Sequence, residues 1–335
     1  MVLSFPFSFG FSVLCVVGSF ISVSSGDWLG VWLGLEINLL GFIPLMIQGA
    51  GGQAVEGAIK YFVVQALGSG FLLLGGLSGG SSLCWFVEAD TAPLSFFCVV
   101  GLVLKLGVAP MHWWVPSVMG GLGWFGCGVL LTWQKLAPFL VLACLNLFSF
   151  WLLVFLGCFS SVLGGAMGVG QSQVRILMAY SSISHWGWIL GLLSLSVVGS
   201  LSYFFFYLVL SVLLFYFLSC AGVWRVGHAV GVGGVFLAVG FLSLGGLPPL
   251  TGFVPKLIGL QVVSSFSSGF LLFFLILGSV LSLYYYLSFL FVLFVAKDGV
   301  YDNNLAKFFR FSVGLGFSML LFGLPFYEFF YSVLV

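Results

Sequence analysis

Six ionisable residues lie inside long apolar stretches of this sequence, where charged side chains are rare. They supply one carboxylate, four ammonium groups and one imidazole: Glu36, Lys60, Lys105, Lys135, Lys256 and His185. An ionisable group in the middle of a lipid bilayer costs roughly 2.5 to 3.5 kcal/mol on insertion scales. A chain that keeps several of them must pair them, hydrate them or turn them inward, and the chemistry that such groups support is the transfer of protons or ions.

Two of the lysines stand beside sequence that interrupts helices. Lys105 is followed by Gly107 and Pro110, and Lys256 is preceded by the segment GGLPPLTGFVP. Proline removes a backbone N–H and clashes with the preceding turn, so both stretches free backbone carbonyls in or near a membrane. Each stretch alone is also consistent with an ordinary loop, but paired interrupted segments are the sequence pattern most typical of a transport site. A break beside a buried lysine, occurring twice, favours a proton pathway.

Two further candidates, His185 and Lys60, have open interpretations. His185 follows Ser181, Ser182 and Ser184 in AYSSISHWGW, so hydroxyls and imidazole could relay protons through water. A histidine satisfied by a neighbouring carbonyl is the alternative. Lys60 stands four residues after Glu56, the spacing of a simple ion pair along one helix face, and is therefore only a secondary candidate for proton transfer.

The composition indicates which elements must hold these residues. Of 335 residues, 62% are apolar and 5% are charged, and the mean hydropathy is +1.28. A soluble domain carries roughly 25% charged residues. The apolar runs reach the ~20 residues that a helix needs to cross a bilayer, and they do not alternate as barrel strands do. We predict an all-α integral membrane protein, a single transmembrane domain over residues 1–335 with no soluble domain.

Apolar runs and the breaks between them predict about eleven transmembrane helices. We expect these helices near residues 3–24, 28–48, 54–78, 92–110, 124–144, 146–166, 173–195, 199–221, 231–262 (broken), 268–295 and 311–334.

The loops between these spans separate by charge when they are assigned alternately to the two sides. One side collects the basic residues, Arg175, Arg225, Lys297, Lys307 and Arg310, and the other carries Asp27, Glu88 and Asp90. By the positive-inside rule, the N-terminus lies on the cytoplasmic or matrix side and the C-terminus opposite.

No motif in the sequence predicts a cofactor. The seven cysteines are scattered without a Cys-x-x-Cys spacing, so we expect neither a disulfide framework nor a metal or iron–sulfur site. No phosphate-binding loop or other nucleotide motif stands out, and we expect no nucleic-acid partner. The abundance of 47 Gly and 40 Phe beside scarce Thr and Asn indicates codons rich in G and T, which suggests a gene in a small organellar genome.

Six segments, in the same order along the chain, resemble the family of NADH-ubiquinone oxidoreductase chain 2 of animal mitochondria. They are residues 34–46 (GLEINLLGFIPLM), 56–65 (EGAIKYFVVQ), 105–116 (KLGVAPMHWWVP), 133–138 (WQKLAP), 181–188 (SSISHWGW) and 245–256 (GGLPPLTGFVPK). The resemblance implies an antiporter-like subunit with inverted repeats, two broken helices and a central hydrophilic axis. Its proton-path residues map onto Glu36, Lys105, Lys135 and Lys256, with a histidine near His185. Ser117 departs from the family, which commonly has a glutamate there.

The same resemblance implies a location and partners. We expect a multi-pass protein of the mitochondrial inner membrane that moves protons from the matrix to the intermembrane space. Neighbouring membrane-arm subunits of respiratory complex I and lipids such as cardiolipin are the expected partners. Hydride and electron transfer would belong to subunits carrying flavin and iron–sulfur clusters, so this chain would be a translocase subunit of NADH:ubiquinone reductase without a redox centre.

Two other functions remain open. A cation/proton antiporter subunit shares the buried lysines and the broken helices, and differs in the proteins with which it assembles. A non-pumping structural subunit of the membrane arm would use the same charges only as salt bridges. Proton flux in charge-neutralised variants distinguishes the structural role from the other two.

Overall fold

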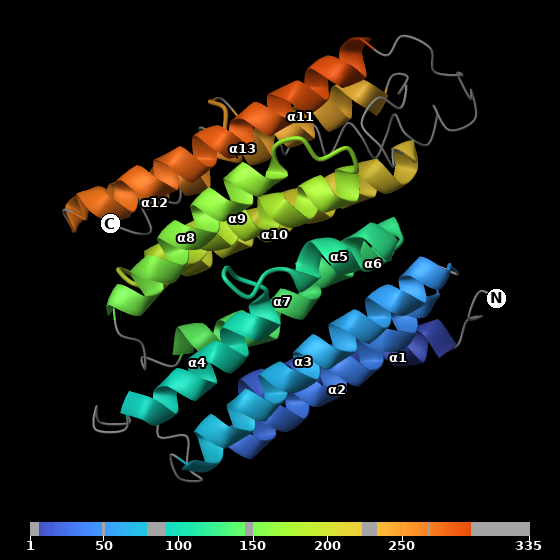
Figure 1. Ribbon diagram of the computed structural model, residues 1–335, viewed down its shortest axis with the longest axis vertical. Helices are drawn as coiled ribbons and strands as arrows, with labels where there is room; N and C mark the ends of the chain where they lie inside the picture. Colours follow the sequence, from blue (N-terminus) through green and yellow to red (C-terminus); the bar gives the residue numbers. More distant parts are fainter. Residues whose placement is uncertain are drawn as a thin grey trace. The chain divides into compact units, whose positions relative to one another are not determined.

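The computed structural model of the protein describes residues 7–48, 51–78, 92–144, 150–222, 233–248, 250–266 and 268–295. In these ranges the chain consists of α-helices joined by short turns, which confirms the predicted all-α class (Figure 1). Contacts divide the chain into two compact units, residues 1–152 and residues 153–335.

In unit 1, the last helix packs on helices from the beginning of the chain. It contains α1 (Phe7–Ser24), α2 (Trp28–Ile47), α3 (Gly52–Ser78), α4 (Ala92–Leu106), α5 (Trp114–Gly121), α6 (Trp124–Leu131) and α7 (Trp133–Cys144). Helix α3 packs on α2, α4 and α5, and α7 packs on α1, α2 and α4. The backbones of α1 and α2 touch, because a methyl group at Gly18 would lie 2.5 Å from the backbone N of Asn38.

Unit 2 is built around α9. Its helices are α8 (Phe150–Gly168), which begins at the end of unit 1, α9 (Val174–Leu193), α10 (Val197–Ala221), α11 (Gly233–Gly245), α12 (Phe253–Ser265) and α13 (Gly269–Val295). Helix α9 packs on α10, α12 and α13. Nearly all of its side chains are buried.

The order of elements is the same in both units. Unit 1 runs through three long helices (α1 to α3), a broken helix (α4 and α5) and a final span (α6 and α7). Unit 2 runs through α8 to α10, a broken helix (α11 and α12) and α13. This repetition agrees with the two broken helices that the sequence predicts.

Both breaks begin at a glycine with a positive φ. Helix α4 ends at Leu106, before Gly107 at φ +67°, and not at residue 110 as predicted. Residues 114–121 form the short helix α5, which the sequence analysis did not predict because it contains Pro116. Helix α11 ends before Gly246 at φ +74°, inside the segment predicted to be broken.

The span predicted at residues 124–144 is confirmed in extent, and one residue divides it into two helices. Thr132 separates α6 from α7, with φ −110° and ψ −75° in the broad right-handed helical region. Helix α7 restarts at once and also contains Pro138.

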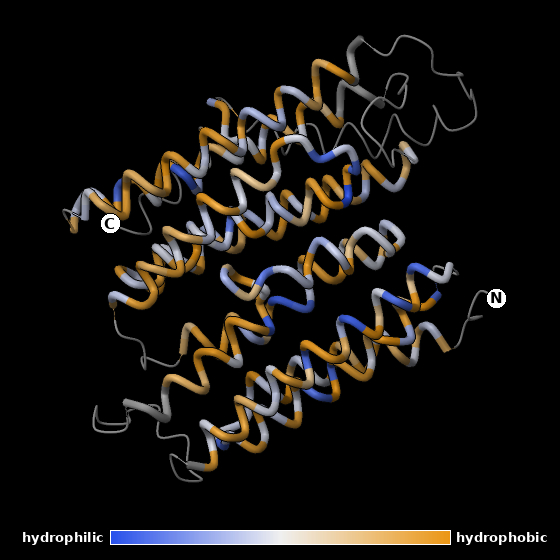
Figure 2. Tube along the Cα trace, viewed as in Figure 1, coloured by the Kyte–Doolittle hydropathy of each residue, from blue (hydrophilic) through white to orange (hydrophobic). Residues whose placement is uncertain are grey.

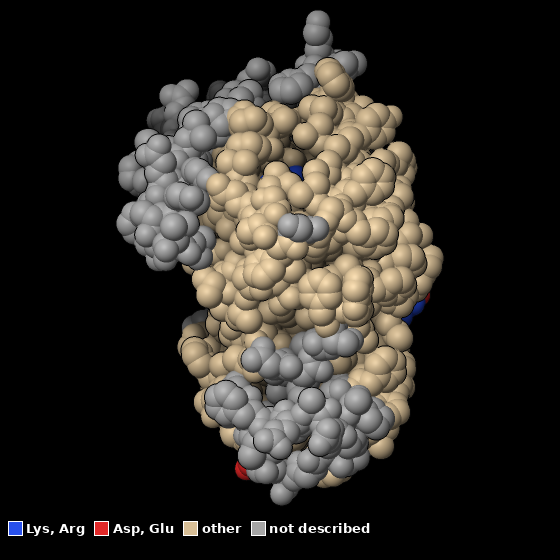
Figure 3. Space-filling view, turned by 90° about the vertical axis from the view of Figure 1, so that its left-hand side faces the viewer, with Lys and Arg blue, Asp and Glu red and all other residues tan. Residues whose placement is uncertain are grey.

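The helices present apolar surfaces suited to lipid. In the described part of the chain, eight helical segments are long and apolar enough to cross a membrane when α6 and α7 count as one. Hydrophobic residues predominate along the helices (Figure 2), and few atoms of Lys, Arg, Asp or Glu are visible among the described residues on the face seen in Figure 3. Large apolar side chains such as Trp151 and Phe125 are exposed, as expected of a lipid-facing surface.

The predicted number of about eleven spans is not confirmed. The broken helices α11 and α12 are each shorter than a full span. The predicted helix at 311–334 and most of the loop charges used for orientation, including Glu88, Arg225 and Lys307, lie outside the described residues. The orientation of the termini therefore stays a prediction.

Candidate functional site

Unit 1 brings Glu36 and Lys105 into electrostatic contact. Glu36 is half-buried on α2, and Lys105 is buried in the last turn of α4. The carboxylate of Glu36 acts electrostatically on Lys105, but no ion pair within 4.0 Å joins these two side chains. The Oε1 atom of Glu36 is buried and has no hydrogen-bond partner among the described residues.

The break after Lys105 leaves carbonyls of α4 that other side chains satisfy. The indole Nε1 of Trp114, at the start of α5, donates to the carbonyl of Leu104 at 3.1 Å. The amide Nε2 of Gln65, on α3, donates to the carbonyl of Lys105 itself at 3.4 Å. An interrupted helix is stable in a membrane only when its freed carbonyls find such donors. These two hydrogen bonds therefore stabilise the break and hold the backbone of Lys105 in place.

Lys135 is the most deeply buried lysine of those described, with 1% of its surface exposed. It lies in the first turn of α7, directly after the interruption at Thr132, and its backbone N–H bonds to the Thr132 carbonyl at 3.3 Å. Because α7 packs on α4 and α2, Lys135 belongs to the same unit core as Lys105 and Glu36.

A buried polar cluster accompanies these charges. Gln134, beside Lys135, donates from Nε2 to Oδ1 of Asn38 at 2.9 Å and accepts from the Tyr61 hydroxyl at 3.2 Å. It thereby joins α7 to α2 and α3. Asn38 and Gln134 belong to two of the segments that resemble the family, but no role was predicted for either. Both are amides inside apolar runs: Asn38 stands two residues after Glu36, and Gln134 stands one residue before Lys135. Polar residues in such positions are rare in membrane helices, and this pattern could have identified them.

In unit 2, Lys256 closes the break between α11 and α12. Its Nζ donates to the carbonyl of Gly245, the last residue of α11, at 2.7 Å. The C-terminal end of a helix carries partial negative charge, so this is a favourable site for an ammonium group. The lysine chain packs over Gly246, where a methyl group would lie 2.6 Å from Cδ of Lys256.

His185 is buried in the same unit. Its Nδ1 is 3.0 Å from the hydroxyl of Tyr203 on α10, and its charge interacts with that of Lys256. Its Nε2 is buried without a hydrogen-bond partner in the described part of the chain. The serines before it donate to carbonyls within α9, for example Ser184 to Ser181 at 2.8 Å, so their hydroxyl protons do not reach the imidazole.

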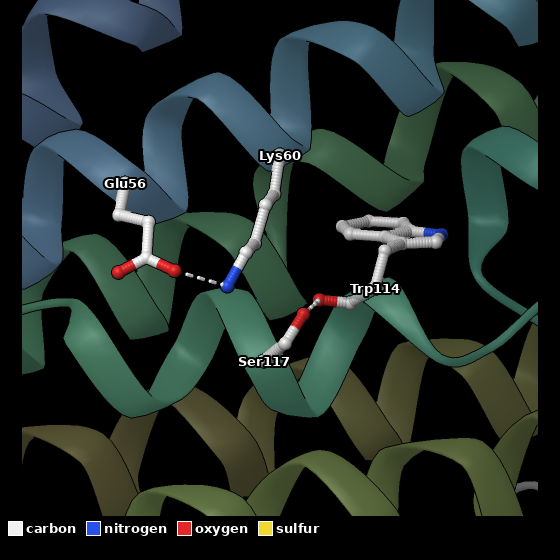
Figure 4. A network of polar contacts seen from close by, with 4 residues as sticks. All are labelled: Glu56, Lys60, Trp114 and Ser117. Carbon is white, nitrogen blue, oxygen red and sulfur yellow. Dashed lines mark hydrogen bonds and ion pairs between the residues drawn. The ribbon is translucent and has the colours of Figure 1, made fainter.

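Lys60 differs from the other candidate lysines. It forms an ion pair of 2.6 Å with Glu56 on the same helix, and 47% of its side chain is exposed. Figure 4 places this pair on the side of α3 that faces α5, near the Ser117 hydroxyl, which donates to the carbonyl of Trp114 at 2.9 Å. This geometry favours the simple ion pair that the sequence left open.

The buried candidates thus form one group in each unit. Glu36, Lys105 and Lys135 are brought together in unit 1, and His185 and Lys256 in unit 2. In both groups an ionisable side chain stands at a helix interruption, where free carbonyls and buried polar groups can stabilise more than one charge state.

Solved structures share this fold. A chain of respiratory complex I from Thermus thermophilus superimposes with a TM-score of 0.82 at 25% identity, covering 95% of this chain and 78% of that one. A chain of the Mrp complex from a Dietzia species gives a TM-score of 0.80 at 19% identity, covering 88% and 62%.

Sequence comparison is more specific. Residues 25–282 match the family model described as NADH:quinone oxidoreductase/Mrp antiporter, TM. The chain is 37% identical over 283 residues to NADH-ubiquinone oxidoreductase chain 2 of Lumbricus terrestris, covering 82% of each protein. It is 41% identical over 287 residues to the protein of that name from Pisaster ochraceus, covering 81% of this chain and 80% of the relative. The chain therefore belongs to the family of NADH-ubiquinone oxidoreductase chain 2, within the antiporter-like membrane subunits of NADH:quinone oxidoreductases and Mrp antiporters.

Proposed function

We propose that this chain translocates protons across the mitochondrial inner membrane as a subunit of NADH:ubiquinone oxidoreductase, from the matrix to the intermembrane space. The observation that carries the proposal is the position of the buried lysines. Lys105 lies in the last turn of α4, Lys135 follows the interruption at Thr132, and Lys256 lies in the first turn of α12. Structural salt bridges alone would not require each lysine to lie at a helix interruption.

In unit 1, Glu36 controls the charge of Lys105. Opposite charges attract strongly in surroundings of low polarity, so the carboxylate stabilises the ammonium of Lys105 while the two are close. Moving them apart leaves a desolvated ammonium, which favours release of its proton. Helix α7 packs on α4, so Lys135 is the acceptor that we assign to this proton. The contact between Gln134 and Asn38 holds α7 in register with the helix that carries Glu36.

In unit 2, His185 and Lys256 complete the pathway and deliver the proton to the side of positive potential. The two groups interact electrostatically, so protonation of one disfavours protonation of the other. The Gly245 carbonyl offers the Lys256 ammonium a defined resting position. A proton arriving at His185 would weaken that position and promote release from Lys256.

The chain itself carries no redox cofactor in this proposal. Flavin and iron–sulfur clusters belong to partner subunits, and the energy reaches this chain through neighbouring membrane-arm subunits. The exposed apolar side chains of the helices provide surfaces for those subunits and for lipids such as cardiolipin. The N-terminus lies in the matrix, as the loop charges of the sequence predict.

The test is the number of protons moved per electron in the assembled complex reconstituted in liposomes. Glu36→Gln and Lys105→Met should lower this ratio, because each removes a charge on which the transfer depends. Lys60→Met is the matched control, since it removes the same ammonium group from an exposed position. An unchanged ratio in both test variants would rule the pathway out and leave the structural role.

The likeness to a chain of an Mrp complex supports a second candidate, a cation/proton antiporter subunit. The proteins that co-purify with the chain separate the two. Flavin and iron–sulfur subunits favour the oxidoreductase, whereas sodium-dependent proton exchange without electron transfer favours the antiporter.

A further inference from the structure

Helix α13 carries three consecutive tyrosines, two of which point into unit 2. Tyr285 and Tyr286 are each 1% exposed, whereas Tyr284 is 60% exposed. Neighbouring residues of a helix point about 100° apart, so this run buries two rings and leaves the third outside. Tyr285 and Tyr286 lie with their ring centroids 4.7 Å apart. Together with Tyr203 and Tyr207 of α10 they form the tyrosine cluster, which has no role in the function proposed above.

Among the described residues, three of the four hydroxyls of this cluster lack a hydrogen-bond partner, whereas that of Tyr203 lies 3.0 Å from Nδ1 of His185. Those of Tyr207, Tyr285 and Tyr286 are buried without a hydrogen-bond partner in the ranges that the structure describes. The Nε2 atom of His185 is also buried without a hydrogen-bond partner in the described ranges. The ring centroids of His185 and Tyr207 lie 5.4 Å apart. Buried polar atoms are nearly always hydrogen-bonded to protein or to ordered water, and four of them around one site call for water.

Acceptors for such water are close by. The Tyr285 hydroxyl lies near the side chain of Ser184 and the Tyr286 hydroxyl near that of Ser181, and the two hydroxyls lie near each other, but none of these approaches meets hydrogen-bond geometry. Both serine hydroxyls already donate to carbonyls of α9, so their oxygens remain available only as acceptors. A water molecule can donate to such an oxygen and accept from the phenol.

The cluster also reaches the Lys256 site. The ring of Tyr286 packs against Gly245, where a methyl group would lie 3.6 Å from its Cδ2 atom. Gly245 is the residue whose carbonyl holds Nζ of Lys256. Tyr286 therefore lies between Ser181, one turn before His185 on α9, and the residue that holds the Lys256 ammonium.

The repeated order of helices also supports a role for α13 in proton transfer. Helix α13 is the last span of unit 2, as α7 is the last span of unit 1, where Lys135 is buried. A phenol has an ordinary pKa of about 10 and stays neutral. Its hydroxyl both donates and accepts a hydrogen bond, so it can pass a proton along a chain of water without holding the charge.

We propose that Tyr207, Tyr285 and Tyr286 bind ordered water that connects His185 to Lys256, and that Tyr286 positions this water for proton transfer. The inference rests on the proposed function and adds residues to it. Each transfer conserves charge: a hydroxyl or water oxygen accepts a proton on one side and gives up its own on the other. No oxidant or reductant takes part.

The test compares Tyr285→Phe and Tyr286→Phe with Tyr284→Phe in the assembled complex reconstituted in liposomes. Phenylalanine keeps the ring and removes only the hydroxyl. In the two buried variants, proton-coupled turnover should fall about tenfold, the effect of one lost hydrogen bond, while electron transfer with an uncoupler stays unchanged. A purely structural defect would lower both rates. Tyr284→Phe should change neither, because its ring is exposed.

Two further readouts separate the possible failures. If Glu36→Gln and Lys105→Met reduce pumping but the buried tyrosine variants behave like Tyr284→Phe, this inference is wrong and the proposed function stands. If the lysine and glutamate variants pump normally, the proposed function fails first. Where a variant does not assemble, a structure of the unaltered complex with resolved water decides: water bound to the Tyr286 hydroxyl supports the inference, and a dry cluster overturns it.

Discussion

Replacing Lys256 with arginine separates the two properties of this side chain, its positive charge and its exchangeable proton. The ammonium donates to the carbonyl of Gly245 at 2.7 Å, and a guanidinium can also donate to a carbonyl. The ordinary pKa of arginine lies at least roughly 2 pH units above that of lysine, which is about 10.4. This difference of roughly 2 pH units makes the deprotonated side chain at least ~100-fold rarer at any given pH.

The structure also sets the expected effect on stability. Lys256→Arg keeps the charge-assisted hydrogen bond, worth about 1.5 to 3 kcal/mol, at the end of α11. The larger side chain must fit over Gly246, where a methyl group would already lie 2.6 Å from Cδ of Lys256. Overpacking of this kind costs about 1 to 3 kcal/mol. The complex should therefore assemble with a modestly lowered melting temperature.

The assay measures proton uptake and NADH oxidation together in liposomes, with and without an uncoupler. We expect Lys256→Arg to slow proton-coupled turnover about 100-fold while uncoupled electron transfer continues. Lys60→Arg is the control, because it makes the same change at an exposed ion pair. Normal coupled turnover in Lys256→Arg would refute a role for Lys256 in releasing protons.

Two substitutions test the supports of the site. Gly246→Ala should destabilise the complex by about 1 to 2 kcal/mol, because an alanine at φ +74° is strained, whereas Gly10→Ala has open space and should not. Equal melting temperatures for the two variants would contradict the strained break. Gln134→Leu leaves Asn38 without its amide donor, a loss of about 1 to 3 kcal/mol, and should lower the yield of assembled complex. Gln53→Leu is the exposed control, and a similar yield from both would show that the Gln134 contact is dispensable.

Much of the fold follows from local sequence. Apolar runs of bilayer length predict α1, α2, α3, α8, α9, α10 and α13, whose described bounds lie within a few residues of the expected ones. Glycine and proline beside Lys105 and Lys256 predict both breaks, because the backbone there cannot continue a helix. Such features depend on the covalent properties of neighbouring residues.

Other features depend on contacts between distant residues. Gln134 forms hydrogen bonds with Asn38 and Tyr61, which lie 96 and 73 positions away in the sequence, and no local pattern predicts such contacts. The interruption at Thr132 was not predicted, because neither Thr132 nor its two immediate neighbours is glycine or proline. Helix α5 was missed because a proline in the first turn of a helix is tolerated, although proline elsewhere breaks one. The exposure of Lys60 likewise required knowing which face of α3 meets α5.

The central claim is that protons cross this chain through its buried lysines. Its most direct test is the proton-to-electron ratio of the reconstituted complex carrying Lys105→Met and Lys256→Met together, one substitution in each unit. We predict a ratio below that of the unaltered complex, with electron transfer to quinone preserved in the presence of an uncoupler. A ratio equal to that of the unaltered complex would contradict the claim.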